Sequence, residues 1–143
     1  MEEHTMFQIP DHQVAGHKAS KGIIGPLIDN SGRFYKPLQS NNRGSKEESF
    51  YKKFSSNTEI PNHIRKFFPT YYGTQHIEAS DGSGQHPHLV LEDIKIKPNE
   101  DRSCVTIKLI DFAHVVDGQG VIDHNFLGGL CSLIKFVSEI LDN

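Results

Sequence analysis

The stretch HLVLEDI (His88 to Ile94) constrains the fold of this sequence more than any other. Its centre is continuously apolar, which is typical of a strand buried on both of its faces. Such a strand needs a covering layer on each side. A chain of 143 residues is long enough to supply this within one domain.

Other segments predict the elements around this strand. Two β-prone runs, around Ile23–Ile28 and Arg33–Leu38, flank the turn DNSG and predict a hairpin. Ser45 and Glu48 have the spacing of a capping box, which predicts the start of a short helix. The segment PNHIRKFF predicts a second short helix with Pro61 in its first turn.

The rest of the chain predicts three strands and a helix. YYGTQHIEA precedes HLVLEDI, and CVTIKLIDF follows it with alternating apolar residues. Asp123 can cap a last helix, whose apolar residues recur at three- and four-residue spacing. These residues are Leu127, Leu130, Ile134, Val137 and Leu141. The order predicts an α+β fold with an antiparallel sheet.

Composition excludes several classes of protein. A net charge of −3 without a domain-wide basic field gives no reason to expect nucleic-acid binding. Cys104 and Cys131 lie far apart without CxxC spacing, which excludes a zinc ribbon and argues against a disulfide framework. The first ten residues lack the apolar region of a secretory signal, and no run of about 20 apolar residues predicts a membrane span. We therefore expect an intracellular protein, in the nucleus or cytoplasm.

Single residues leave alternatives open. The sequence contains no Walker A motif, and its nine histidines lack the paired spacing of a zinc site. Taken alone, Lys36 and Arg43 are ordinary solvated cations, and Glu47 favours the start of a helix through its charge. Asp111 lies among Leu109, Ile110 and Phe112. Its partner is either a nearby backbone N–H, as in a turn, or a metal ion that carries a phosphate.

Six blocks of sequence, taken together, are more informative about the type of protein than any single residue. They are HQVAGH (12–17), GRFYKPLQ (32–39), RGSKEESFY (43–51), FFPTYYGT (67–74), HLVLEDI (88–94) and LIDFAHVVDGQGVIDHNFLGGLCSLIKF (109–136). In this order they resemble the inositol polyphosphate kinase family, and most closely its plant-type multikinases. The resemblance covers nearly the whole chain except Lys95 to about Cys104. It implies a fold related to protein kinases and transfer of the ATP γ-phosphoryl group to hydroxyls of inositol phosphates such as the trisphosphate and tetrakisphosphate.

The resemblance also implies roles for individual residues. Lys36 would pair with the ATP phosphates, and Glu47 would be its helix partner. The backbone at Glu92 and Ile94 would form the hinge that binds adenine. Asp111 would bind Mg²⁺. For the inositol phosphate, the resemblance implies contacts from Arg43 and His114.

One family motif is missing. The pattern P-x-x-x-D-x-K-x-G should follow the hinge, but from Pro98 it would require Asp at position 102 and Lys at 104, where the chain has Arg102 and Cys104. The resemblance thus divides the chain into an ATP-binding small lobe with hinge (1–94), a junction where the family's middle is missing (95–103) and a large-lobe remnant with the metal motif and terminal helix (104–143).

This loss has consequences for activity and folding. No residue of the missing motif is left for catalysis, so we expect phosphoryl transfer to be absent or strongly impaired. The alternative is a non-catalytic module that binds nucleotide or inositol phosphate. The strand CVTIKLIDF needs a new partner, for which His88–Ile94 is one candidate, and the last helix could cover the sheet or leave an apolar face exposed. Oligomeric state stays open.

Overall fold

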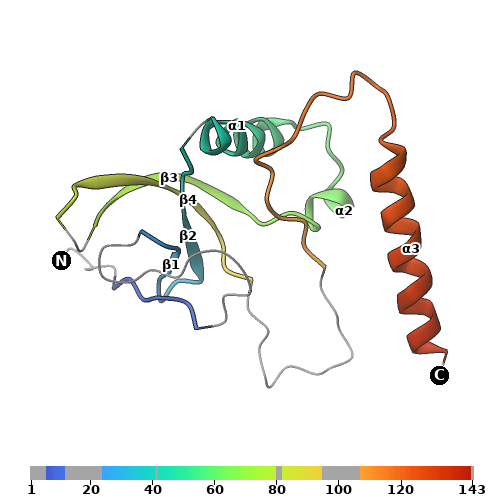
Figure 1. Cartoon of the computed structure of the whole chain (residues 1–143), viewed down its shortest axis with the longest axis horizontal. Coiled ribbons are helices and arrows are strands. Elements are labelled where there is room, and N and C mark those ends of the chain that lie inside the picture. The colour runs from blue at the N-terminus through green and yellow to red at the C-terminus, as the bar shows by residue number, and fades with distance from the viewer. Residues whose placement is uncertain (1–5, 12–23, 41, 80–81, 95–106, 143) are drawn as a thin grey trace.

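The computed structural model describes residues 6–11, 24–40, 42–79, 82–94 and 107–142 (Figure 1). Its centre is a four-stranded antiparallel sheet in the order β1-β2-β4-β3. The strands are β1 (Leu27–Ile28), β2 (Arg33–Pro37), β3 (Tyr71–Glu78) and β4 (Gln85–Glu92). The predicted α+β class with an antiparallel sheet, similar to the small lobe of a kinase, is confirmed.

Strand β4 lies inside the sheet, as its apolar centre predicts. It pairs with β2 on one side, where Lys36 is opposite Leu89, and with β3 on the other. Leu89, Val90 and Leu91 are each at most 5% exposed. Leu89 and Leu91 pack against helix α1 (Arg43–Ser56), whereas Val90 packs with Tyr35 and Ile77 on the opposite face.

The hairpin of β1 and β2 is held by a buried carboxylate. Asp29 accepts hydrogen bonds from the backbone N–H groups of Ser31 and Arg33, and from the hydroxyls of Ser31 and Tyr35. Burial acts to raise the pKa of Asp29, but the hydrogen bonds from Ser31, Tyr35 and Arg33 outweigh it and hold that pKa below its usual value. The predicted hairpin is confirmed, and its turn is a folded polar network.

Helix α1 does not begin where the sequence predicts. α1 starts at Arg43, so Ser45 lies inside the helix and the capping box is wrong. Glu48 instead pairs with Lys52 and accepts a hydrogen bond from Thr74. The second predicted helix is α2 (Asn62–Arg65), which ends earlier than expected.

The C-terminal part departs most from the prediction. Within 107–112, the described part of CVTIKLIDF, no strand forms. A strand there could not pair with β4, because β2 and β3 already occupy both edges of β4. Residues 107–113 instead run past α1 and the end of α2, where Leu109 N–H donates to the carbonyl of Phe67 (2.7 Å).

The last helix, α3 (His124–Leu141), forms as predicted. Asp123 caps it by accepting hydrogen bonds from the N–H groups of Asn125 and Phe126. It does not cover the sheet: every one of its residues is exposed, and Figure 1 shows it apart from the other elements. Among the described helices, none combines the length and apolarity that crossing a membrane requires.

Candidate functional site

The candidate site begins with a lysine on the helix-covered face of the sheet. Lys36 lies opposite Leu89 in the β2–β4 pairing, and residues paired across two strands point to the same face. Leu89 packs under α1, so the Lys36 side chain also points toward α1. It is 23% exposed, which leaves its ammonium group accessible from one side.

Helix α1 supplies the partner of this lysine. Glu47 Oε1 lies 2.9 Å from Lys36 Nζ, and the Glu47 side chain is 3% exposed. The predicted pairing of these two residues is confirmed. Removing one partner of a pair that is largely withdrawn from water is costly, because the other charge is then left uncompensated.

The position of Glu47 depends on a close approach of α1 to the chain leaving β2. Gly44 N–H donates to the carbonyl of Gln39 (3.1 Å), and a Cβ atom on Gly44 would lie 2.5 Å from that same oxygen. Only glycine lets the first turn of the helix lie this close. The same contact places Glu47, one turn later, above Lys36.

Asp111 joins the pair from a part of the chain 75 residues away. Its Oδ1 lies 3.4 Å from Lys36 Nζ, and its side chain is 64% exposed. The carboxylate is therefore not buried, although it lies in an apolar stretch of sequence. Its backbone has φ = 67°, a left-handed conformation that is uncommon for a residue other than glycine.

Phe112 fixes this segment to the helix. Its ring stacks on Phe50 at 4.0 Å between centroids and also contacts Phe68 and Tyr51. The next residue, Ala113, is 3% exposed. This anchor was not among the predictions from sequence, although the helical spacing of Phe50 and Phe54 indicates an aromatic surface that needs a partner.

Tyr51 places a polar atom beneath the cluster. Its side chain is 1% exposed, and its hydroxyl has no hydrogen-bond partner among the described residues. Burial raises the pKa of Tyr51 well above its usual value, and the charges of Glu47 and Asp111 raise it further. The hydroxyl therefore remains protonated and can act as a donor.

The predicted hinge is tied to the same C-terminal segment. The Glu92 carboxylate pairs with Lys108 Nζ at 3.0 Å and accepts hydrogen bonds from the backbone and hydroxyl of Thr70. Burial acts to raise the Glu92 pKa, but Lys108 and Thr70 together lower it. The Glu92 N–H donates to the carbonyl of Thr70, so this N–H is already engaged.

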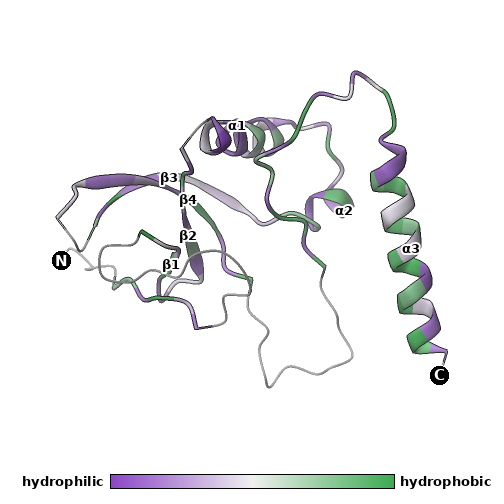
Figure 2. Cartoon of the chain, in the orientation of Figure 1, coloured by the Kyte–Doolittle hydropathy of each residue, from purple (hydrophilic) through white to green (hydrophobic). Residues whose placement is uncertain are grey.

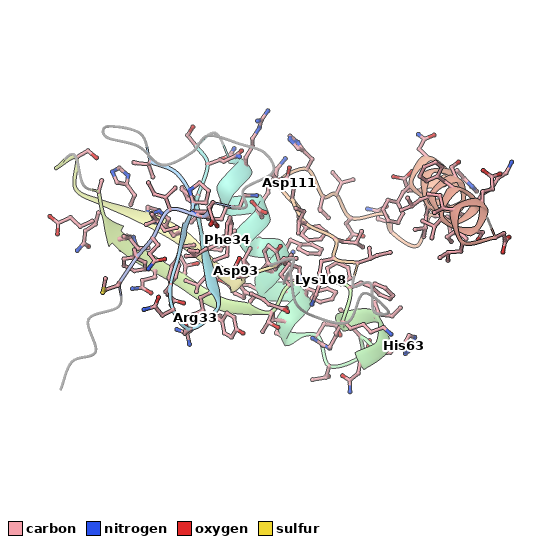
Figure 3. The ribbon with its side chains drawn as sticks, turned by 90° about the horizontal axis from the view of Figure 1, so that it is seen from below. Arg33, Phe34, His63, Asp93, Lys108 and Asp111 are labelled. Carbon is pink, nitrogen blue, oxygen red and sulfur yellow. The ribbon has the colours of Figure 1, made fainter. Side chains whose placement is uncertain are left out.

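The remaining predicted residues are solvent-accessible. Ile94 is 43% exposed, and Arg43 and His114 are also exposed, at the start of α1 and three residues beyond Asp111. The motif HQVAGH falls outside the described residues. Figure 3 shows Asp111 and Lys108 along the same side of α1, with Phe34 and Asp93 nearby and α3 well apart.

The cluster fits a metal ion only together with a phosphate. In the part of the chain that the structure describes, no three His, Cys, Asp or Glu residues group closely enough to hold a metal by themselves. Mg²⁺ in nucleotide sites commonly takes one or two carboxylates and fills its other positions with phosphate oxygens and water. Asp111 meets this requirement because its carboxylate is accessible and lies next to the cation Lys36.

An antiparallel sheet whose strand lysine pairs with a helix glutamate defines the class of this protein: the sheet and α1 form a kinase-like small lobe. Comparison with known families agrees. A family model described as "Inositol polyphosphate kinase" matches residues 71–138. No solved structure matches the chain.

Curated relatives extend the match beyond this region. Inositol polyphosphate multikinase beta of Arabidopsis thaliana is 29% identical over 284 aligned residues, covering 96% of this chain and 95% of the relative. The alpha protein of the same plant is 29% identical over 277 residues, covering 96% and 97%. An inositol polyphosphate multikinase of Oryza sativa subsp. indica is 28% identical over 276, covering 92% and 94%.

The chain is similar to the inositol polyphosphate kinase family over residues 71–138, and the relatives that it resembles over most of its length are plant multikinases. It is much shorter than they are. The alignment of 284 residues with the beta protein exceeds the 143 residues of this chain by 141, so at least that many residues of the relative have no counterpart here.

Proposed function

We propose that this chain retains the nucleotide-binding half of an inositol polyphosphate multikinase and has lost most or all of its capacity for phosphoryl transfer. The observation that supports this is the position of Lys36 Nζ between the carboxylates of Glu47 and Asp111. A cation held by a helix carboxylate, next to a second, accessible carboxylate, is the arrangement that kinases use for Mg-ATP.

Each described residue has a distinct task in this proposal. Lys36 binds phosphate oxygens of ATP, and Glu47 keeps the lysine extended toward them. The 3.4 Å contact between Lys36 and Asp111 is long and exposed, so a phosphate oxygen and its metal can replace it at little cost. The carbonyl of Glu92 and the N–H of Ile94 bind adenine. When bound at Asp111, Mg²⁺ supplies positive charge to the β- and γ-phosphates.

The part of the site that positions the inositol phosphate acceptor is largely missing from this chain. Arg43 and His114 are exposed and available to an inositol phosphate. The motif P-x-x-x-D-x-K-x-G is absent, and we place the missing residues of the relatives between the hinge and Asp111. Phosphoryl transfer depends on positioning the acceptor and neutralising charge, so this loss should lower the rate by orders of magnitude.

The direct test is turnover. The purified chain is incubated with Mg-ATP labelled at the γ-phosphate and with inositol trisphosphate or tetrakisphosphate, and the products are separated by anion exchange. We expect at most a trace of product, at least about 1,000-fold below a full-length plant multikinase assayed in parallel. A rate within tenfold of that enzyme would contradict the loss of transfer.

A second candidate function is a non-catalytic nucleotide-binding module, which the intact Lys36–Glu47–Asp111 cluster favours. Mg-ATP should then raise the melting temperature, because a ligand that binds only the native state stabilises it. The rise should disappear in Lys36→Ala and persist in Lys53→Ala, a control at an exposed lysine of α1. No shift in the parent chain at millimolar Mg-ATP would contradict nucleotide binding.

A further inference from the structure

Helix α3 exposes more apolar surface than any other described element. All of its residues are exposed, and nine large apolar side chains are between 40% and 78% exposed. These are Phe126, Leu127, Leu130, Leu133, Ile134, Phe136, Val137, Ile140 and Leu141. Figure 2 shows the contrast within this helix between hydrophobic stretches and a few hydrophilic turns. A soluble monomer rarely leaves so large an apolar patch uncovered.

The nine side chains lie on one half of the helix. At 3.6 residues per turn, they span an arc of about 180°. Five of them recur at spacings of three, four, three and four residues, which is the seam of helices that pair with one another. These five are Leu127, Leu130, Ile134, Val137 and Leu141. The other four lie together along one side of this seam.

The opposite half identifies what can cover the seam. It carries Lys135 and Glu139, which pair with each other, together with Ser132 and Ser138. Helices that lie on a membrane surface have a polar face rich in Lys and Arg. Here the two charges cancel, so two copies of α3 can approach without repulsion, whereas an anionic lipid surface gains nothing.

The available area is sufficient for pairing. The exposed fractions of the nine side chains amount to roughly 800 Å² of apolar surface, which is about what one partner contributes to a stable interface of standard size. Pairing would also leave the candidate nucleotide site accessible, since α3 lies apart from α1 and Asp111 (Figures 1 and 3).

We propose that α3 is a self-association helix, which pairs with α3 of a second copy of this chain along the seam from Leu127 to Leu141. This inference does not depend on the proposed nucleotide binding. Each copy covers the apolar half of the other, and the polar half with Lys135 and Glu139 faces water.

The test measures the mass of the full chain in solution by sedimentation equilibrium between about 1 and 100 µM. A reductant is present, because Cys131 is exposed and could otherwise form a disulfide between copies. We expect a reversible dimer. The double variant Leu130→Glu with Ile134→Glu should weaken association at least 100-fold, and Ser132→Glu, on the polar half of the same helix, should leave it unchanged.

Each remaining outcome would overturn the proposal. A parent chain that is monomeric throughout this range, or whose mass grows without limit, has no defined seam. Equal association of the double variant would place the contact elsewhere. A chain that is monomeric in solution but sediments with vesicles of phosphatidylcholine and phosphatidylserine would show that lipid covers the face. Circular dichroism of the double variant confirms that the sheet and α1 remain folded, since α3 packs on neither.

Discussion

Helices α1 and α3 have similar lengths, but they stand in opposite relations to the rest of the molecule. α1 buries Gly44, Glu47 and Tyr51 against the sheet, although its sequence is mostly polar. α3 is far more apolar and buries nothing within the chain. The comparison shows that an apolar pattern predicts a helix that needs a partner, but a covered face forms only where the chain supplies that partner.

The segment 107–113 separates the packed part of the molecule, which includes α1, from the exposed part, which includes α3. It is held to the small lobe by Phe112, by the bond from Leu109 to Phe67 and by the pair between Lys108 and Glu92. From His114 onward, all described residues are exposed. Asp111, the predicted metal ligand, therefore lies next to the last packed residues of the C-terminal part, Phe112 and Ala113.

The largest expected effect comes from releasing the segment 107–113 from the small lobe. Phe112→Ala removes a ring that stacks on Phe50, and we expect a loss of about 3 kcal/mol in the free energy of unfolding. Release of the segment should also remove the thermal shift by Mg-ATP. Urea unfolding measures the change in the free energy of unfolding. Val116→Ala, at a position 79% exposed just beyond this segment, is the control and should change stability by less than about 0.5 kcal/mol. Equal effects of the two would show that Phe112 is no anchor.

Glycine substitutions sharpen the contrast between the two helices. Gly44→Ala should destabilise the protein by about 2 kcal/mol, because its Cβ would meet the backbone of Gln39. Gly128→Ala in α3 meets open space and should raise helicity, with a gain of about 0.5–1 kcal/mol for that helix. Thermal melts and circular dichroism measure both. If Gly44→Ala were neutral, the close approach of α1 to Gln39 would be wrong.

Neutralising one carboxylate in each helix should again destabilise the protein more in α1 than in α3. Both losses of stability should be smaller than those above. Glu47→Gln leaves Lys36 without its buried partner and should cost about 1–2 kcal/mol, a value reduced because Lys36 is partly exposed. In α3, Glu139→Gln disturbs a pair whose side chains are 77% and 62% exposed, so we expect at most a few tenths of a kcal/mol. A cost for Glu139→Gln as large as that for Glu47→Gln would contradict the difference in burial.

The smallest effect is a pH dependence confined to the packed region. The folded-state pKa of Asp29 lies below its unfolded value of 3.8, so its contribution to stability is complete above that value and is lost as pH falls through the folded pKa. Asp29→Asn should therefore flatten the decline in melting temperature below about pH 4. Asp117→Asn, in the exposed segment, is the control. A decline as steep in Asp29→Asn as in the parent chain would rule out this contribution.

Local patterns in the sequence were enough to predict most of the elements. The apolar centre of β4, the turn of the first hairpin and the cap at Asp123 each depend on neighbours in the chain, and each formed as expected. The pairing of Lys36 with Glu47 came from the family resemblance, and the structure bears it out. The functional roles of these residues, and of Arg43, Glu92, Ile94, Asp111 and His114, stay predictions.

Contacts between distant parts of the chain were decided only by the tertiary structure. An alternating pattern in CVTIKLIDF indicates a possible strand, but a strand also requires a neighbour with a free edge, and β4, the candidate partner, has β2 and β3 on its two edges. The approach of Asp111 to Lys36 spans 75 residues and depends on the insertion of Phe112 among aromatic rings. The sequence by itself determined that α3 would be a helix with one apolar half, because that depends on spacing alone. Whether that half is covered depends on which surface the folded chain presents to it, and none of the elements that the structure describes packs on it.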